Sequence, residues 1–114
     1  MKKELALDAL AALGQETRLD VFRLLVKAGK EGMPAGAISD ALDVRPNTLS
    51  THLGVLSRSG LVNAERDGRS ILYRADLAAM GDLVTYLLQD CCGGNPELCA
   101  PIASLERSRR AAPP

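Results

Sequence analysis

The stretch that decides the fold runs from residue 35 to residue 75 and reads AGAISDALDVRPNTLSTHLGVLSRSGLVNAERDGRSILYRA. Its first eight residues suit a short helix, and residues 43–45 suit a tight turn. Pro46 is well placed to begin a second helix, because the fixed φ of proline is already that of the first helical turn. This second helix is expected to run to about Ser59. Three leucines at helical spacing form its buried face: Leu49, Leu53 and Leu56.

The periodicity changes from helix to strand after Gly60. Leu61–Arg66 and Ser70–Ala75 are short runs that favour strands, and the Asp67-Gly68 pair between them is a strong hairpin-turn signal. A short helix, a tight turn, a longer helix and a hairpin follow each other in the order of a winged helix-turn-helix. The sequence therefore predicts a mainly α protein with a β-hairpin wing.

Further helices are expected on both sides of this stretch. The first covers Leu5–Leu13, the second starts at Thr17 as N-cap and stops near Gly29, and residues 32–34 form a break. The last helix starts at Asp76 as N-cap and ends around Cys91. The inward faces of these three helices are expected to carry Ala6, Ala9, Leu10, Leu13, Leu19, Phe22, Leu25, Val26, Leu77, Met80, Val84, Leu87 and Leu88.

Length and composition indicate one small domain. With 114 residues, 46% of them hydrophobic, a single chain buries a modest core, so pairing with a second copy would enlarge it. No apolar run approaches the roughly 20 residues that a membrane span needs, and no apolar segment follows Lys2 and Lys3 as in a signal peptide. We expect a cytoplasmic protein without a membrane partner. Its domain covers residues 1–103, and residues 104–114 form a disordered tail.

Charge is unevenly distributed although the formal net charge is zero. Residues 44–75 carry five arginines against two acidic side chains, whereas residues 76–106 carry acidic side chains alone. A basic middle beside an acidic end suggests one face that meets phosphate and another that does not.

The second helix of the pair has an outward side suited to a DNA major groove. That side carries Asn47, Thr51, Gly54 and Arg58, with Thr48, Ser50 and His52 on the flanks, and short hydrogen-bonding side chains of this kind can reach base edges. Gly54 fits a very close approach to DNA, or it is a tolerated surface glycine. Arg66 and Arg69 flank the hairpin turn and suit phosphate contact or a narrow minor groove. Taken alone, they also fit an ordinary solvated hairpin.

Three cysteines, Cys91, Cys92 and Cys99, lie within nine residues. Thiolates select soft ions such as As(III), Sb(III), Cu(I), Cd(II) or Zn(II). Three thiolates without a nearby histidine match the three-coordinate site that As(III) and Sb(III) prefer, whereas zinc usually takes four ligands. Trivalent methylated arsenic needs only two. The alternatives are that the cysteines are small apolar fillers, or that they form a disulfide.

Several motifs in order resemble the ArsR/SmtB family of metal-responsive repressors. They are residues 10–19 (LAALGQETRL), 48–56 (TLSTHLGVL), 60–62 (GLV) and 66–69 (RDGR), with Tyr73. The resemblance covers about Leu5 to Leu88 and implies a homodimer joined through its first and last helices, which represses by binding double-stranded, palindromic operator DNA. The DNA contacts that it implies are Asn47, Thr48, Ser50, Thr51, His52, Arg66 and Arg69.

The family resemblance also bears on the cysteines. The Cys-Cys pair and the downstream cysteine resemble the C-terminal arsenite site of one ArsR subgroup, which makes Cys91, Cys92 and Cys99 the ligands. The third helix lacks the cysteines, and the last helix the histidines, of two other family sites. Many members have His where Thr51 stands and Lys where Gly54 stands, so the operator sequence does not carry over.

The function expected from the sequence is a repressor that As(III), Sb(III) or methylarsenite releases from DNA. A thiol redox sensor, or a sensor of Cd, Zn or Cu on the same fold, is the alternative. A small thiol enzyme is disfavoured, because the chain has no Cys-x-x-Cys pair, no anion-cradling loop after a strand and no obvious general base. A dimerising interaction domain that does not touch DNA is a further rival.

Overall fold

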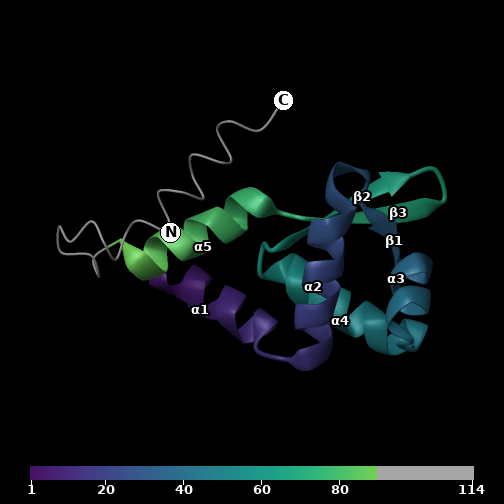
Figure 1. The fold of residues 1–114 in the computed structure, drawn as a ribbon, viewed down its shortest axis with the longest axis horizontal. Coiled ribbons are helices and arrows are strands. Elements are labelled where there is room, and N and C mark those ends of the chain that lie inside the picture. The colour runs from purple at the N-terminus through teal and green to yellow at the C-terminus, as the bar shows by residue number, and fades with distance from the viewer. Residues whose placement is uncertain (90–114) are drawn as a thin grey trace.

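The computed structural model describes residues 1–89 of the chain. Figure 1 shows that α1 and α5 lie side by side and project from a unit formed by the other helices and a small sheet. The mainly helical fold with a hairpin wing confirms the predicted winged helix-turn-helix. In chain order the elements are α1 (Lys3–Leu13), α2 (Glu16–Ala28), the 3-10 helix η1 (Gly29–Glu31), β1 (Met33–Pro34), α3 (Ala35–Leu42), α4 (Pro46–Arg58), β2 (Val62–Asp67), β3 (Ser70–Ala75) and α5 (Leu77–Leu88).

Some sequence predictions fall outside this range. The three cysteines, the predicted helix end around Cys91 and the expected tail at residues 104–114 are not among the described residues. Within residues 1–89, no helix has the length and apolar character that crossing a membrane requires.

Side chains cap the starts of α2 and α5. Asp76 is the N-cap of α5 as predicted, and its carboxylate accepts a hydrogen bond from the Ala79 amide at 2.9 Å. The predicted cap of α2, Thr17, is wrong, because Gln15 takes that place and its Oε1 accepts from the Arg18 amide at 2.9 Å. The longer side chain of Gln15 reaches the same kind of unpaired amide that a threonine cap would satisfy.

The sheet has three antiparallel strands in the order β1-β3-β2. Strands β2 and β3 form the predicted hairpin, but its turn is Gly68-Arg69, one residue later than predicted, because Asp67 still pairs with Ser70. Gly68 takes the positive φ of 63° that this turn requires. The sequence predicts a break without regular structure at residues 32–34, but Met33 and Pro34 form strand β1. Met33 pairs with Tyr73 and Pro34 with Leu72. A proline is tolerated there because β1 is an edge strand.

The core lies where α2, α3, α4 and the sheet meet. All three leucines predicted for the buried face of α4 are at most 2% exposed. Each buried leucine contributes about 1.5–3 kcal/mol relative to an exposed one. The fully buried side chains that surround them are Val21, Leu25, Ile38, Leu61 and Val62.

The inward faces predicted for α1, α2 and α5 are partly wrong. Helix α1 turns alanines toward the rest of the chain, because small side chains allow close packing, and Leu10 is 41% exposed instead of buried. In α2, Val21 is buried in place of Leu19 and Val26, and in α5 Leu83 is buried in place of Leu77 and Leu87. The large side chains that the chain leaves exposed on α1 and α5 are Leu5, Leu7, Leu10, Leu77 and Leu87.

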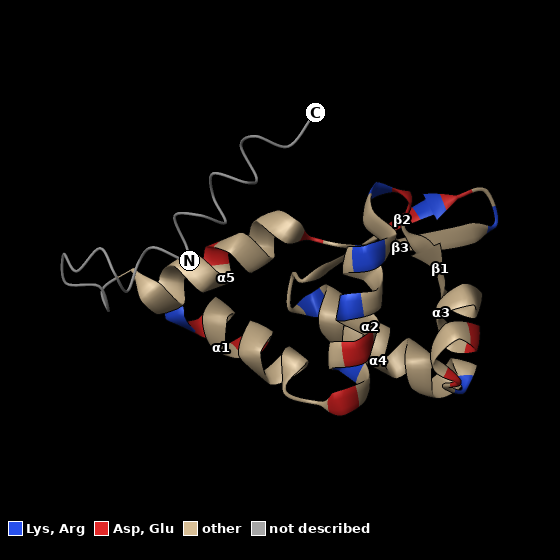
Figure 2. Ribbon diagram, viewed as in Figure 1, with Lys and Arg blue, Asp and Glu red and all other residues tan. Residues whose placement is uncertain are grey.

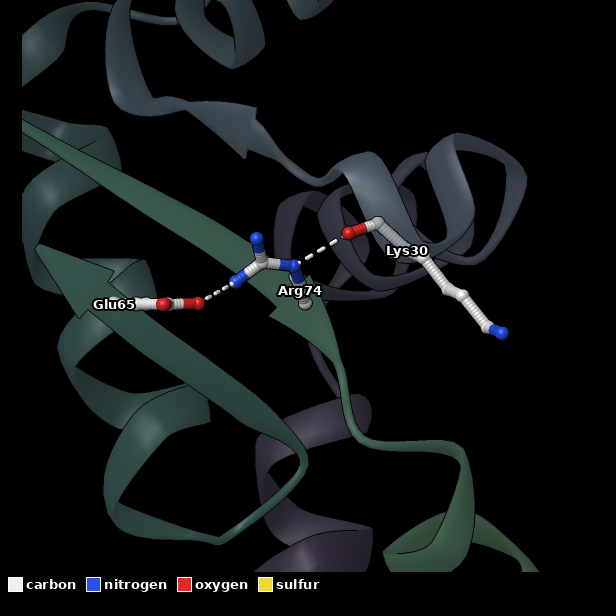
Figure 3. Close-up of polar contacts among 3 residues, drawn as sticks. All are labelled: Lys30, Glu65 and Arg74. Atoms are coloured by element: carbon white, nitrogen blue, oxygen red, sulfur yellow. Dashed lines mark hydrogen bonds and ion pairs between the residues drawn. The ribbon is translucent and has the colours of Figure 1, made fainter. Parts of the chain in front are cut away.

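Arg74 ties the base of the wing to the segment between α2 and β1. Its Nε donates to the carbonyl oxygen of Lys30 at 2.6 Å, and its Nη1 forms an ion pair with Glu65 of β2 (Figure 3). The Glu65 side chain is 67% exposed, so the ion pair itself contributes little. The main effect is geometric, because one rigid guanidinium joins η1, β2 and β3.

Gly32 lets β3 pass directly against the chain at this point. Its φ is +66°, and a Cβ there would lie 2.7 Å from the Tyr73 carbonyl oxygen and 2.8 Å from Cγ of Arg74. The oxygen belongs to the backbone of β3, so it cannot move without moving the wing.

Replacing Gly32 by alanine should therefore displace the wing as well as destabilise the fold. Gly29 is a matched control, because it has the same φ of +66° and a Cβ added to it would meet nothing within 4 Å. We expect Gly29→Ala to lower the free energy of unfolding by about 1–3 kcal/mol through its backbone alone, because its φ of 66° and ψ of −145° are adopted almost only by glycine. Gly32→Ala should cost at least about 2 kcal/mol more, from the added clash. Urea denaturation of both variants measures this, and equal losses would contradict it.

Candidate nucleic-acid interface

The side of α4 opposite its buried leucines is exposed and almost uncharged. Asn47, Thr48, Ser50 and Thr51 are all exposed, and Arg58 is the one charged residue of the helix (Figure 2). The sequence predicted this division, because the leucine stripe sets which residues point outward. The helix can therefore present several hydrogen-bonding groups to a base edge without relying on charge.

Two of these polar side chains also bond to the helix itself. Thr51 Oγ1 donates to the Asn47 carbonyl at 3.3 Å, which leaves the oxygen lone pairs of Thr51 as acceptors. Asn47 Oδ1 accepts from the Thr48 amide at 3.0 Å. The amide group of Asn47 has no partner within residues 1–89, so both of its N–H donors are available to a ligand.

His52 is half-buried and faces a residue that sequence reasoning missed. Its Nδ1 lies 3.3 Å from Nη1 of Arg18, which belongs to the first turn of α2. Arg18 is 34 positions away in the chain, so no local pattern points to the contact. The structure thus places His52 at the junction of α4 with α2.

Arg58 folds back along α4 over Gly54. A Cβ on Gly54 would lie 3.2 Å from Nη1 of Arg58. The atom it would meet is the end of an exposed, flexible side chain that can move aside, so this contact does not itself require glycine. Arg58, which the sequence predicts to contact DNA, lies at the C-terminal end of α4, whereas Asn47 lies at its N-terminal end.

The wing carries two arginines with free head groups. Arg66 lies near the end of β2 and Arg69 in the turn itself, both are exposed, and neither guanidinium has a hydrogen-bond or ion-pair partner in the part of the chain that the structure describes. Arg74 and Glu65, by contrast, are paired with each other at the base. In Figure 2 the wing carries charges of both signs, whereas α4 carries few. The wing can therefore supply the positive charge that α4 lacks.

The predicted metalloid ligands cannot be placed in the same way. Cys91, Cys92 and Cys99 lie outside the described residues, three or more positions beyond the end of α5 at Leu88. Residues 1–89 contain no group of three or more His, Cys, Asp or Glu side chains arranged to hold a metal ion.

Comparison with known proteins identifies this architecture. A family model described as a helix-turn-helix domain matches residues 13–65. An ArsR-like transcriptional regulator from Rhodococcus sp. RHA1 has a similar structure, with a TM-score of 0.71 and 28% identity over 85% of this chain and 89% of the other.

Two sequence relatives are more alike over shorter lengths. An HTH-type transcriptional regulator of Methanocaldococcus jannaschii is 36% identical and covers 59% of this chain and 73% of its own. A protein of Halobacterium salinarum, assigned as the repressor ArsR of an arsenical resistance operon, is 34% identical over 65% of this chain and 57% of its own. All these relatives are described as regulators of transcription and none as an enzyme. The chain therefore belongs to the helix-turn-helix transcriptional regulators, and its winged-helix fold is that of ArsR-like regulators.

Proposed function

We propose that the chain is a homodimeric repressor that binds double-stranded operator DNA and leaves it when As(III) binds Cys91, Cys92 and Cys99. The observation that best supports sequence-specific DNA binding is the exposed polar face of α4, on which Arg58 is the one charged residue, beside a wing with two arginines whose guanidinium groups have no partner within residues 1–89. Helix α4 enters the major groove, where its Asn, Ser and Thr side chains meet base edges. The wing contacts the flanking phosphates or minor groove.

The exposed leucines on α1 and α5 support a dimer. Leu7 is 56% and Leu87 48% exposed, and the two helices lie side by side away from the core (Figure 1). Burial of these apolar side chains by a second copy of the chain would stabilise a dimer. A dimer carries two α4 helices, which bind half-sites about one turn of DNA, or 34–36 Å, apart.

The three cysteines support a soft inducer. Three thiolates and no nearby histidine suit As(III) or Sb(III), and two of them suffice for methylarsenite. The Halobacterium relative, assigned to an arsenical resistance operon, is in line with this ligand. The cysteines follow α5, a helix of the proposed dimer interface, so a bound metalloid favours a dimer with the wrong half-site spacing. A coupling of a few kcal/mol is enough to empty the operator.

Substitutions on α4 and on the wing should weaken DNA binding in different ways. Arg69→Gln should weaken operator and unrelated DNA alike, and reduce the slope of log K against log salt by about 0.9 for one lost phosphate contact. Ser50→Ala should weaken the operator alone, about 5- to 100-fold, and leave the slope unchanged. Fluorescence anisotropy over a salt series measures both. The same pattern of loss in the two variants would contradict the assignment.

The dimer can be tested with a matched pair of leucines. Leu7→Glu on α1 should give a monomer that has lost most operator affinity, because a charge cannot be buried unpaired in the interface. Leu19→Glu is the control, since Leu19 is 43% exposed but lies on α2. Sedimentation velocity gives the oligomeric state. A dimer that survives Leu7→Glu would show that α1 does not form the interface.

The cysteine site is tested by replacing each cysteine with serine. We expect all three variants to bind the operator like the unmodified protein and to resist release by arsenite. Release by methylarsenite should survive the loss of one cysteine, because that ligand takes two thiolates. If arsenite still releases all three variants, the site lies elsewhere. If peroxide releases the reduced protein and arsenite does not, the chain is a redox sensor.

A further inference from the structure

Arg18 joins three parts of the chain through one guanidinium. Its Nε donates to the Ala12 carbonyl at 2.7 Å, its Nη2 to the Ala11 carbonyl at 3.4 Å, and its Nη1 lies 3.3 Å from Nδ1 of His52. The two carbonyls belong to the last turn of α1, where C=O groups carry partial negative charge that a cation stabilises, and the Ala11 carbonyl also accepts from the Gly14 amide at 3.2 Å. The remaining contact reaches α4.

A groove separates α1 from α4 beside this contact. It has a volume of about 410 Å³, and its walls include Ala11 and Ala12 of α1, Val55 and Arg58 of α4, and Arg18 itself. Packed side chains do not fill this space. Helices α1 and α4 also contact each other directly, and the Arg18 guanidinium adds directed hydrogen bonds between them at this groove.

The contact also sets the hydrogen-bonding state of His52. A guanidinium has N–H donors and no acceptor, so Nδ1 of His52 must accept and carry no proton. The ring proton of the neutral histidine then sits on Nε2. His52 thus keeps one N–H donor on its other edge, while Arg18 holds the ring in place.

We propose that Arg18 is a positioning residue for DNA reading. It fixes α4 relative to α1, the helix of the proposed dimer interface, and it holds His52 with Nδ1 as acceptor and Nε2 as donor. The role rests on the proposed function, because it matters only if α4 reads DNA in a dimer. Arg18 itself makes no phosphate contact in this role.

A double-mutant cycle on operator binding tests the role. Arg18→Gln and His52→Ala should each lower operator affinity about tenfold, and the double variant should lose no more than the larger single loss. The slope of log K against log salt should stay unchanged. The control is Arg23→Gln, an exposed arginine of α2 without a partner in residues 1–89, which should bind like the unmodified chain. Additive losses, or a slope reduced by about 0.9 in Arg18→Gln, would make Arg18 a phosphate contact and overturn the proposal.

Two conservative variants of His52 separate a positioning role from loss of stability. His52→Asn keeps a polar atom near the place of Nδ1, and His52→Gln keeps one near the place of Nε2. If Arg18 acts through the ring, His52→Asn should recover part of the affinity that His52→Ala loses, and Arg18→Gln should abolish that recovery. Recovery that is independent of Arg18 would overturn the proposal. Both His52 variants leave the Arg18 contacts with α1 intact, so their effects on affinity do not come from loss of those contacts. If Arg18→Gln unfolds, Arg18→Lys takes its place, and it should abolish the recovery by His52→Asn.

A measurement without DNA separates this inference from the proposed function. His52 is the only histidine, so its two ring nitrogens are assigned directly in a ¹⁵N NMR spectrum. The neutral ring of the unmodified protein should carry its proton on Nε2 alone, and Arg18→Gln should let a part of the neutral rings carry it on Nδ1. A neutral ring with its proton on Nδ1 in the unmodified protein would overturn the inference. An unmodified protein with this ring state that fails to bind its own upstream DNA would overturn the proposed function and leave the Arg18 contact standing.

Discussion

The burial of one leucine stripe determines what α4 can present to a partner. Leu49, Leu53 and Leu56 lie on one side of the helix, and all are at most 2% exposed. A shift by one residue turns a helix by about 100°, which would carry these leucines into solvent and polar groups into the core. The loss of several kcal/mol of burial prevents such a rotation. The outward placement of Asn47 and Thr51 is thus a result of packing on the other side.

The same constraint explains how much of the fold the sequence predicts. Both helices of the central pair and both strands of the wing follow from strong periodicity and clear turn residues, and α3, α4 and β3 match within a residue. Helix α1 is different, because it is apolar on several sides and its alanines, not Leu10, pack against the chain. Choosing between two apolar faces needs knowledge of the neighbouring helices. Strand β1 has two residues, which is too few to show any period.

The residues of the candidate interface are predictable from sequence for similar reasons, but the prediction misses the tertiary contacts. Side-chain chemistry and helix phase are enough to select Asn47, Ser50 and Thr51. The roles of Arg18 and Arg74 cannot be predicted in this way. Arg18 contacts the ring of His52, 34 positions away, and Arg74 donates to the carbonyl of Lys30, 44 positions away. A long flexible side chain leaves no trace of its partner in the local sequence.

The separation of charge between α4 and the wing has a consequence for how such a protein changes over time. Because α4 has a single charged residue, the proposed function implies that substitutions along its polar face would alter the preferred base sequence without altering the attraction to DNA in general. A lineage can then acquire a new binding site while its search along the chromosome keeps the same speed. The anchored base of the wing, where Gly32 and Arg74 meet, keeps that electrostatic part in place while the reading helix diversifies.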